Sequence, residues 1–337
     1  LDESDRILVN LPLFHVGGLF MVTNSFHAGS LNVNMSKFDA GKAVALIEEK
    51  NVSVLFDFSP ILSSILEEQK KSGGDLSSLK TVAGLDTPET IEKFQAETGG
   101  TFYCMYGQTE TSCVATYGRY DDRPGSAGRV IPLADVRLVD DYDKPVPLGE
   151  AGEIVMKGPM VFKGYWNLPE DNAYAFRNGW HHTGDLGRID DDGYLAIVGR
   201  KKEIIVTSSG KNISPHEIET HLKAHPLIGQ VMAIGDDRNY ISALLVLDPE
   251  ASEAWARKHD VPFSSLAEFS QREEVRAAVA EAVEAANSRL ARVEQVKRWE
   301  LLPTDWTVES GELTPSLKLK RHVVSSKYAD VIDGIYQ

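Results

Sequence analysis

The sequence contains little cysteine. Cys104 and Cys113 are the two cysteines among 337 residues. Two thiols cannot form a disulfide framework, and together with nine dispersed histidines they offer no zinc-binding spacing such as CxxC or HExxH. This scarcity favours a reducing compartment, so we expect a cytoplasmic protein.

Long apolar runs are missing as well. No uninterrupted run approaches the roughly 18 to 20 residues that a membrane-spanning helix needs. No basic start followed by an apolar segment marks a signal peptide. We therefore expect a soluble chain without a transmembrane segment, whereas peripheral membrane association and the oligomeric state stay open.

Positive charge is in deficit. The chain carries 35 Lys and Arg against 50 Asp and Glu, for a formal net charge of -15. A chain of this charge repels a phosphate backbone, so no nucleic-acid partner is expected. Basic residues cluster at residues 200–202 and 318–322.

Three common signatures are absent. The sequence has no GxGxxG, no GxSxG and no GxxxxGK[ST]. These absences remove the simplest dehydrogenase, α/β-hydrolase and Walker-A interpretations. Any nucleotide chemistry must use another kind of site.

What is present is concentrated in residues 179–215, GWHHTGDLGRIDDDGYLAIVGRKKEIIVTSSGKNISP. The DDDG turn at 190–193 between apolar runs predicts a hairpin tip. A hairpin does not need Trp180, Asp185 or Arg200, so we expect this stretch to bind a ligand.

Strand-like and helix-like segments alternate in the first third of the chain. The apolar periodicity predicts strands at 6–13, 30–34, 52–56, 79–84 and 101–105, and helices at 14–28, 39–50, 59–71 and 87–98. This alternation predicts an α/β fold with a mainly parallel sheet. The turn YGQTETS at 106–112 then follows a strand, where open α/β sheets bind ligands.

The pattern of predicted strands and helices changes twice further along the chain. From Gly125, short strands broken by glycine and proline suggest a small barrel or sandwich. After residue 200 we expect a strand at 203–207, a helix at 215–224, strands near 230–235 and 242–247, and a long helix at 272–296. The predicted domains are therefore 1–200, with an α/β part at 1–118 and a β-rich part at 119–200, and 201–337.

Five stretches in one order carry a family resemblance. They are LPLFHVGG at 11–18, YGQTETS at 106–112, GEIVMKGPMVFKGYW at 152–166, GWHHTGDLG with GRKKEIIVTSSGKNISP at 179–215, and LTPSLKLKR at 313–321. Together they resemble the adenylate-forming superfamily of acyl-CoA synthetases, luciferases and peptide-synthetase adenylation domains, and most closely the long-chain fatty acyl-CoA synthetases. The resemblance implies a large α/β plus β-barrel domain, truncated at its N-terminus, followed by a smaller α+β C-terminal domain.

The resemblance assigns the YGQTE turn to ATP. It implies that Tyr106 stacks on adenine, that Gly107 and Gln108 belong to the same nucleotide-binding turn, and that Thr109 contacts a phosphate oxygen. Glu110 would bind the Mg²⁺ that accompanies ATP. The chemistry agrees, because an aromatic face suits a purine and a hard cation prefers carboxylate oxygen. The alternative for Glu110 is a solvated acid at a helix start.

Further nucleotide contacts are implied elsewhere. Asp185 resembles the aspartate that accepts both ribose hydroxyls, and Arg200 would touch the ribose or a phosphate. Asp185 could instead satisfy only turn amides. Gly84 lies in VAGLD at 82–86, where many relatives carry a glycine-alanine-proline turn beside adenine, so contacts there are in doubt.

The resemblance places His15, Val16, Gly17 and Gly18 beside the acyl pocket, near the substrate carboxylate. The alternative for His15 is a satisfied core side chain. In the C-terminal domain, Ser209, Gly210, Lys211 and Asn212 resemble the loop that lines the pantetheine tunnel of coenzyme A.

Two lysines carry the remaining roles. Lys202 falls where the family keeps a hinge residue, and Lys318 aligns with the catalytic lysine that holds the carboxylate and the α-phosphate together. The alternative for Lys202 is a solvated surface lysine, and the alternative for Lys318 is a basic strand edge that prevents aggregation.

The family's Ser/Thr/Gly-rich phosphate loop should precede LPLFHVGG, and the sequence does not contain it. We therefore expect a fragment that is catalytically impaired. The expected parent activity is that of an AMP-forming fatty acid–CoA ligase using ATP, Mg²⁺ and coenzyme A, with long-chain acids favoured and medium-chain or aryl acids open. The alternatives are a peptide-synthetase adenylation domain and a non-catalytic nucleotide- or acyl-binding remnant.

Overall fold

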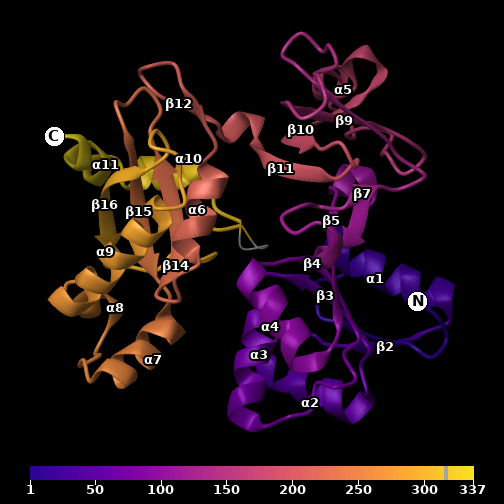
Figure 1. Ribbon diagram of the computed structural model, residues 1–337, viewed down its shortest axis with the longest axis horizontal. Helices are drawn as coiled ribbons and strands as arrows, with labels where there is room; N and C mark the ends of the chain where they lie inside the picture. The colour runs from indigo at the N-terminus through magenta and orange to yellow at the C-terminus, as the bar shows by residue number, and fades with distance from the viewer. Residues whose placement is uncertain (315–317) are drawn as a thin grey trace. The chain divides into compact units, whose positions relative to one another are not determined.

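The structure is a computed structural model that describes residues 1–314 and 318–337. The chain forms two compact units, Leu1–Val198 and Gly199–Gln337 (Figure 1). The boundary that the sequence predicts, between residues 200 and 201, lies next to this division. No helix in the described part of the chain is both long and apolar enough to cross a membrane.

The first unit contains a seven-stranded sheet in the order β2-β1-β3-β4-β5-β6-β7. The strands are β1 (Arg6–Val9), β2 (Leu31–Asn34), β3 (Val54–Phe58), β4 (Thr81–Leu85), β5 (Thr101–Tyr106), β6 (Thr116–Arg119) and β7 (Arg129–Val130). The first five pair in parallel, and β6 and β7 add antiparallel strands. The expectation of a mainly parallel sheet is confirmed.

Helices cover both faces of this sheet (Figure 1). They are α1 (Val16–Ala28), α2 (Ala40–Lys50), α3 (Ile61–Ser72) and α4 (Pro88–Thr98). Leu55 of β3 packs in one core with α2, α3 and α4, whereas its neighbours Val54 and Phe56 pack in another core with Met21 of α1. Alternate residues of a strand point to opposite faces, so one apolar run serves both cores.

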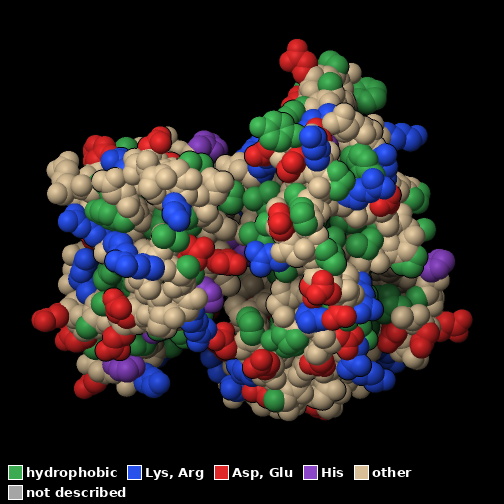
Figure 2. Space-filling model, turned by 45° about the horizontal axis from the view of Figure 1, so that its top comes forward, with side chains coloured by type: hydrophobic (Ala, Val, Ile, Leu, Met, Phe, Trp, Pro, Cys, Tyr) green, Lys and Arg blue, Asp and Glu red, His purple; other side chains and the backbone are tan. Residues whose placement is uncertain are grey.

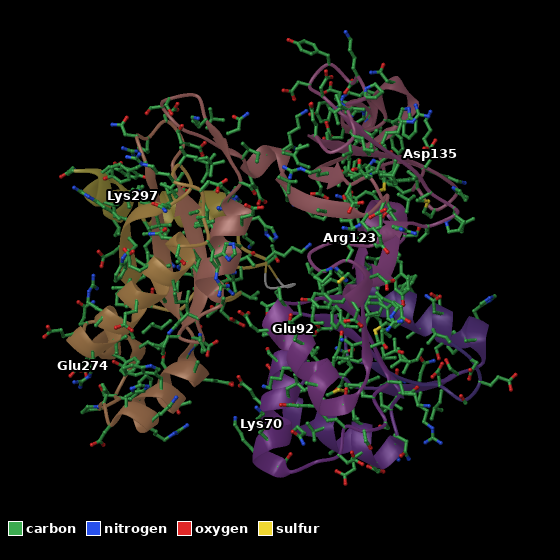
Figure 3. The ribbon with its side chains drawn as sticks, viewed as in Figure 1. Lys70, Glu92, Arg123, Asp135, Glu274 and Lys297 are labelled. Carbon is green, nitrogen blue, oxygen red and sulfur yellow. The ribbon has the colours of Figure 1, made fainter. Side chains whose placement is uncertain are left out.

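A four-stranded antiparallel sheet, in the order β11-β10-β9-β8, follows in the chain. Its strands are β8 (Asp135–Val139), β9 (Ala151–Lys157), β10 (His181–Ile189) and β11 (Leu195–Arg200), and the short helix α5 (Pro169–Ala175) precedes β10. The predicted hairpin tip is confirmed between β10 and β11, where Gly193 has a φ of 81°. Arg123, labelled in Figure 3, forms ion pairs with Asp190 at 3.2 Å and with Asp192, and thereby holds this tip.

The second unit has a small ribbon, a three-stranded sheet in the order β14-β15-β16, and surrounding helices. The ribbon pairs β12 (Ile205–Val206) with β13 (Asn212–Ile213), and the sheet comprises β14 (Ile228–Ile234), β15 (Ile241–Leu247) and β16 (Val296–Leu302). The helices are α6 (Pro215–Lys223), α7 (Pro249–His259), α8 (Leu266–Phe269), α9 (Glu273–Asn287), α10 (Arg321–Lys327) and α11 (Ala329–Tyr336). Leu245 of β15 packs with α6 and α9, and its neighbours Leu244 and Val246 pack with α10 and α11.

The long helix predicted at 272–296 is too long. Helix α9 ends at Asn287, whose buried side-chain amide donates to the carbonyl of Val296 at 3.0 Å and accepts from its N–H at 2.8 Å. These bonds turn the chain into β16, and Val293 is 49% exposed instead of lying on a buried helical face. The predicted strand at 203–207 is shortened to β12, because residues 201–203 form a 3₁₀ turn.

Charged side chains of both signs are interspersed on the surface that Figure 2 displays. The net charge of -15 is therefore not gathered into a single acidic face in that view.

Candidate nucleotide-binding site

The candidate site begins where β5 ends. Tyr106 is the last residue of β5, and Gly107 opens the turn that follows. A Cβ at Gly107 would lie 1.8 Å from the carbonyl oxygen of Cys113, so the turn closes only over glycine. The next residues form a 3₁₀ turn in which Thr111 accepts from the Gln108 N–H at 2.8 Å.

Asp185 is brought to this turn from β10. The Tyr106 hydroxyl donates to Asp185 Oδ2 at 2.7 Å, and Gln108 Nε2 donates to the same oxygen at 2.6 Å. The pairing of β10 with β9 is irregular between His182 and Leu186, which displaces the backbone around this carboxylate. Asp185 is 7% exposed, and its N–H donates to the Thr183 hydroxyl at 3.1 Å.

Glu110 lies on the same 3₁₀ turn. The Tyr165 hydroxyl donates to Glu110 Oε1 at 3.0 Å, and the Phe162 N–H donates to the Glu110 carbonyl at 2.8 Å. Burial, together with the bond to Glu110, raises the pKa of Tyr165 to about 12, so the hydroxyl stays a donor. Thr109 precedes Glu110 and is exposed.

Sequence reasoning missed the aromatic side chains beside Glu110. The rings of Phe162 and Tyr165 lie 4.8 Å apart, those of Phe162 and His181 5.3 Å apart, and Phe176 packs against both Phe162 and His181. Burial lowers the pKa of His181, which keeps its ring neutral at pH 7. These side chains lie in and near the segments GYW at 164–166 and GWHH at 179–182. No local sequence pattern predicts that the two segments come together.

Gly84 lies on β4 between β3 and β5. Its φ is 158°, and an added Cβ would lie 1.8 Å from the carbonyl oxygen of Asp57 on β3. Close packing of strands therefore already requires glycine here. Burial raises the pKa of the neighbouring Asp57 carboxyl and also that of Asp86.

The predicted acyl-site residues form the start of α1. His15 Nδ1 accepts from the Gly17 N–H at 3.1 Å, which makes His15 the N-cap of the helix. A Cβ at Gly18 would lie 2.4 Å from the Pro12 carbonyl, and Val16 packs beside the core that contains Phe56. β1 and β3 pair in parallel, so the turn after β1 and Phe58 at the end of β3 lie at the same edge of the sheet. The ring centroids of His15 and Phe58 are 6.5 Å apart.

The remaining predicted residues lie in the second unit. Arg200 Nη1 is 3.9 Å from Glu203 Oε1, and Lys202 is exposed on the 3₁₀ turn at 201–203. Ser209, Gly210, Lys211 and Asn212 form an exposed turn with Gly210 at a φ of 75°. The Thr207 carbonyl accepts from the Gly210 N–H at 2.8 Å and fixes this turn.

Lys318 is exposed. Its N–H donates to the Thr314 hydroxyl at 3.0 Å and its carbonyl accepts from the Thr314 N–H at 2.8 Å. Residues 315–317 of the LTPSLKLKR motif lie outside the described residues. Two residues before Thr314, the buried Glu312 accepts from Lys327 at 2.5 Å and from the Tyr328 hydroxyl at 3.2 Å.

Comparison with known proteins places these residues in a family. Residues 1–166 match the AMP-binding enzyme family, and residues 202–337 match the AMP-binding enzyme C-terminal domain. The long-chain-fatty-acid–CoA ligase FadD15 of Mycobacterium bovis is 39% identical over 72% of this chain and 39% of its own length. The indoleacetate–CoA ligase of Aromatoleum aromaticum is 38% identical over 70% of this chain and 47% of its own length.

A solved structure agrees across both units. The O-succinylbenzoate coenzyme A synthetase of Bacillus subtilis, in complex with ATP and magnesium ion, matches with a TM-score of 0.76 and 26% identity over 96% of this chain and 62% of its own. These matches cover 39%, 47% and 62% of the relatives' own lengths, so the chain spans about half the length of the relatives that it matches. The two family matches and the shared fold lead to one conclusion: the chain belongs to the AMP-binding, or adenylate-forming, enzyme superfamily.

Proposed function

We propose that this chain is part of an AMP-forming acyl-CoA ligase that activates a fatty acid. The observation that carries the proposal is the convergence of Tyr106 and Gln108 on one oxygen of Asp185, with Glu110 on the same turn. The arrangement lies beyond the carboxyl end of a parallel strand, where open α/β sheets bind ligands.

Each carboxylate has a task that its chemistry suits. Asp185 accepts hydrogen bonds from the ribose hydroxyls of ATP, since a carboxylate has two acceptor oxygens. Glu110 binds the Mg²⁺ that enters with ATP, because oxygen ligands suit this hard cation. The exposed Thr109 hydroxyl donates to a phosphate oxygen.

The reaction has two steps. In the first, a carboxylate oxygen of the fatty acid bonds to the α-phosphorus of ATP, and pyrophosphate leaves. In the second, the sulfur of coenzyme A bonds to the acyl carbon, its proton passes to solvent, and AMP leaves with the electrons of the broken acyl-oxygen bond. We assign Lys318 to the first step, as a cation that offsets charge at phosphorus, and the turn at 209–212 to the second.

A long-chain fatty acid is the favoured substrate class. FadD15 is named for long-chain acids, and the sequence motifs at 179–215 and 313–321 resemble the long-chain synthetases. The indoleacetate–CoA ligase of Aromatoleum aromaticum is 38% identical, so a comparison of fatty and aryl acids as substrates decides the point.

The test is pyrophosphate release with ATP, Mg²⁺ and a panel of fatty and aryl acids. The assay uses residues 1–337 and, in parallel, the protein extended to the length of its relatives. We expect little activity from residues 1–337, because no Ser/Thr/Gly-rich phosphate loop is in this sequence to hold the β- and γ-phosphates.

In the extended protein, Lys318→Ala should lower acyl-adenylate formation by about 10² to 10³-fold. The same variant should still convert supplied acyl-adenylate and coenzyme A to thioester. Undiminished adenylation in Lys318→Ala would overturn the role of Lys318. An extended protein that binds ATP but converts no acid would overturn the ligase proposal in favour of a binding protein.

A further inference from the structure

Two carboxylates and a histidine form a compact group in the four-stranded sheet. Asp143 lies in the turn between β8 and β9, Glu153 lies on β9, and His182 lies on β10. The side chains of Glu153 and His182 are 3% and 2% exposed, and that of Asp143 is 18% exposed. None of the three has a role in the nucleotide site proposed above.

The distances within this group fit a metal ion. His182 Nδ1 is 3.4 Å from Glu153 Oε2 and 3.8 Å from Asp143 Oδ1, and one ligand atom from each residue lies within 4.8 Å of the others. Metal–ligand bonds of about 2.0 to 2.2 Å in a tetrahedral zinc site separate neighbouring ligand atoms by about 3.3 to 3.6 Å. The group therefore needs only small side-chain shifts to enclose such an ion.

Arg177 contacts both carboxylates, and His182 Nδ1 faces them. Arg177 Nη2 is 2.9 Å from Glu153 Oε2, and Arg177 Nε is 3.3 Å from Asp143. The Nδ1 atom of His182 points at both carboxylates and makes no hydrogen bond within the described residues.

Arg177 does not exclude a metal. A carboxylate oxygen can accept from a donor and bind a metal at once, because it has two lone pairs. The Gly184 N–H also donates to Glu153 at 3.3 Å, and Asn178 Nδ2 donates to Asp143 at 2.8 Å. Donors of this kind orient the carboxylates of metal sites from behind.

We propose that Asp143, Glu153 and His182 bind a divalent transition-metal ion of the zinc type. The ligands are His182 Nδ1 and one oxygen from each carboxylate, and water completes the tetrahedron. An imidazole nitrogen in the set favours Zn²⁺ over Mg²⁺ or Ca²⁺, which prefer oxygen ligands throughout. The ion would link the β8–β9 turn to β10, the strand that presents Asp185.

The test is metal binding by the 337-residue chain. The protein is stripped with a chelator, dialysed against Zn²⁺ and assayed for bound zinc, and Co²⁺ is added separately to record its visible d–d spectrum. The variants are His182→Gln and Asp143→Asn, and the matched control is His27→Gln, which removes an exposed histidine at the end of α1.

We expect about one bound zinc in the wild type and in His27→Gln, a higher Tm with zinc, and an intense tetrahedral Co²⁺ spectrum. His182→Gln and Asp143→Asn should bind zinc at least 10-fold more weakly. Should His182→Gln fail to fold, Asp143→Asn decides, because its side chain is the more exposed. Zinc binding that is equal in all variants, or absent from the wild type, overturns the proposal and identifies the group as an ion-pair cluster only.

Discussion

At the scale of single residues, the candidate site depends on hydrogen bonds between side chains far apart in the sequence. Tyr106 is the last residue of β5 and Gln108 lies in the turn after it, whereas Asp185 comes from β10. Both donors converge on one carboxylate oxygen, which fixes the carboxylate before any ligand binds. A preorganised acceptor binds without a further loss of side-chain entropy.

The Tyr106 hydroxyl can be removed without removing its ring. Tyr106→Phe deletes one donor to Asp185 and should weaken AMP binding by about 10-fold or more, because a hydrogen bond to a charged group contributes about 1.5 to 3 kcal/mol. Isothermal titration with AMP measures the change. Tyr142→Phe, at a side chain that is 84% exposed, is the control. Equal affinity in the two variants would show that the hydroxyl does not position Asp185.

Tyr165 should influence the metal dependence of ATP binding. Tyr165→Phe deletes the donor to Glu110, so the carboxylate loses its fixed orientation and more Mg²⁺ should be needed, by about 3- to 10-fold. The measurement is ATP affinity as a function of Mg²⁺ concentration. Tyr174→Phe, at an exposed side chain, should leave that dependence unchanged. A loss of affinity in Tyr165→Phe that Mg²⁺ concentration does not alter would contradict a role through Glu110.

Both thiols should be poorly reactive in the native chain. Burial raises the pKa of Cys104 and that of Cys113 to about 11 each. Because the thiolate is the reactive form, roughly a thousandth of each thiol is ionised at pH 8. A disulfide reagent should therefore label the native protein slowly, label it faster as the pH rises toward 11, and label both cysteines at once in guanidinium. Rapid native labelling at pH 8 would show that the unit opens readily.

At the scale of elements, tight turns at strand ends decide where the site residues lie. Gly107 is the clearest case, since the chain folds back until the Cys113 carbonyl occupies the space of a side chain. Gly84 has the same steric relation to Asp57, so two neighbouring strands of the sheet depend on glycine near the site. The glycines themselves can be seen in the sequence. Which backbone carbonyl lies against each of them is decided by the fold.

Gly107→Ala should disturb this turn through steric overlap. Its added methyl would lie 1.8 Å from a carbonyl oxygen, so we expect destabilisation by about 1 to 3 kcal/mol and at least 10-fold weaker AMP binding. Urea unfolding and AMP titration measure the two effects. Gly334→Ala on α11 has no atom within 4 Å of the added methyl and should leave AMP binding unchanged. A fully stable Gly107→Ala protein would show that the turn relaxes easily.

At the scale of the whole molecule, the chain consists of two units with separate hydrophobic cores. The buried clusters that contain Leu245 and Trp306 draw all their residues from Gly199–Gln337. The clusters that contain Leu55, Phe56 and Ile154 draw theirs from Leu1–Val198. A unit with its own core has what a domain needs to fold alone.

Residues 199–337 expressed alone should fold cooperatively. We expect a helical circular-dichroism spectrum, a single sigmoidal urea transition and dispersed amide resonances, because both cores on the β14-β15-β16 sheet are complete within this unit. A broad transition or an unfolded spectrum would show that the unit depends on the rest of the chain.

The sequence alone was sufficient for the fold class, the family and much of the element order. Helices such as α3 keep their apolar residues at helical spacing, and the strands of the α/β part are short apolar runs. Five motifs in a fixed order indicated the family, because the motifs and their order can be recognised whatever residues lie between them. These are local or linear properties, so they can be read along the chain.

Only the tertiary structure decided which side chains meet. Asn287 ends α9 through bonds to Val296, Gln108 reaches Asp185, and His182 faces Asp143 and Glu153. Each contact depends on strand register, on the irregular pairing of β9 with β10, or on a turn that reverses the chain. The periodicity of apolar residues predicts which face of a helix or strand is buried. It does not predict which side chains that face contacts, because strand register and the packing of the whole sheet decide those contacts.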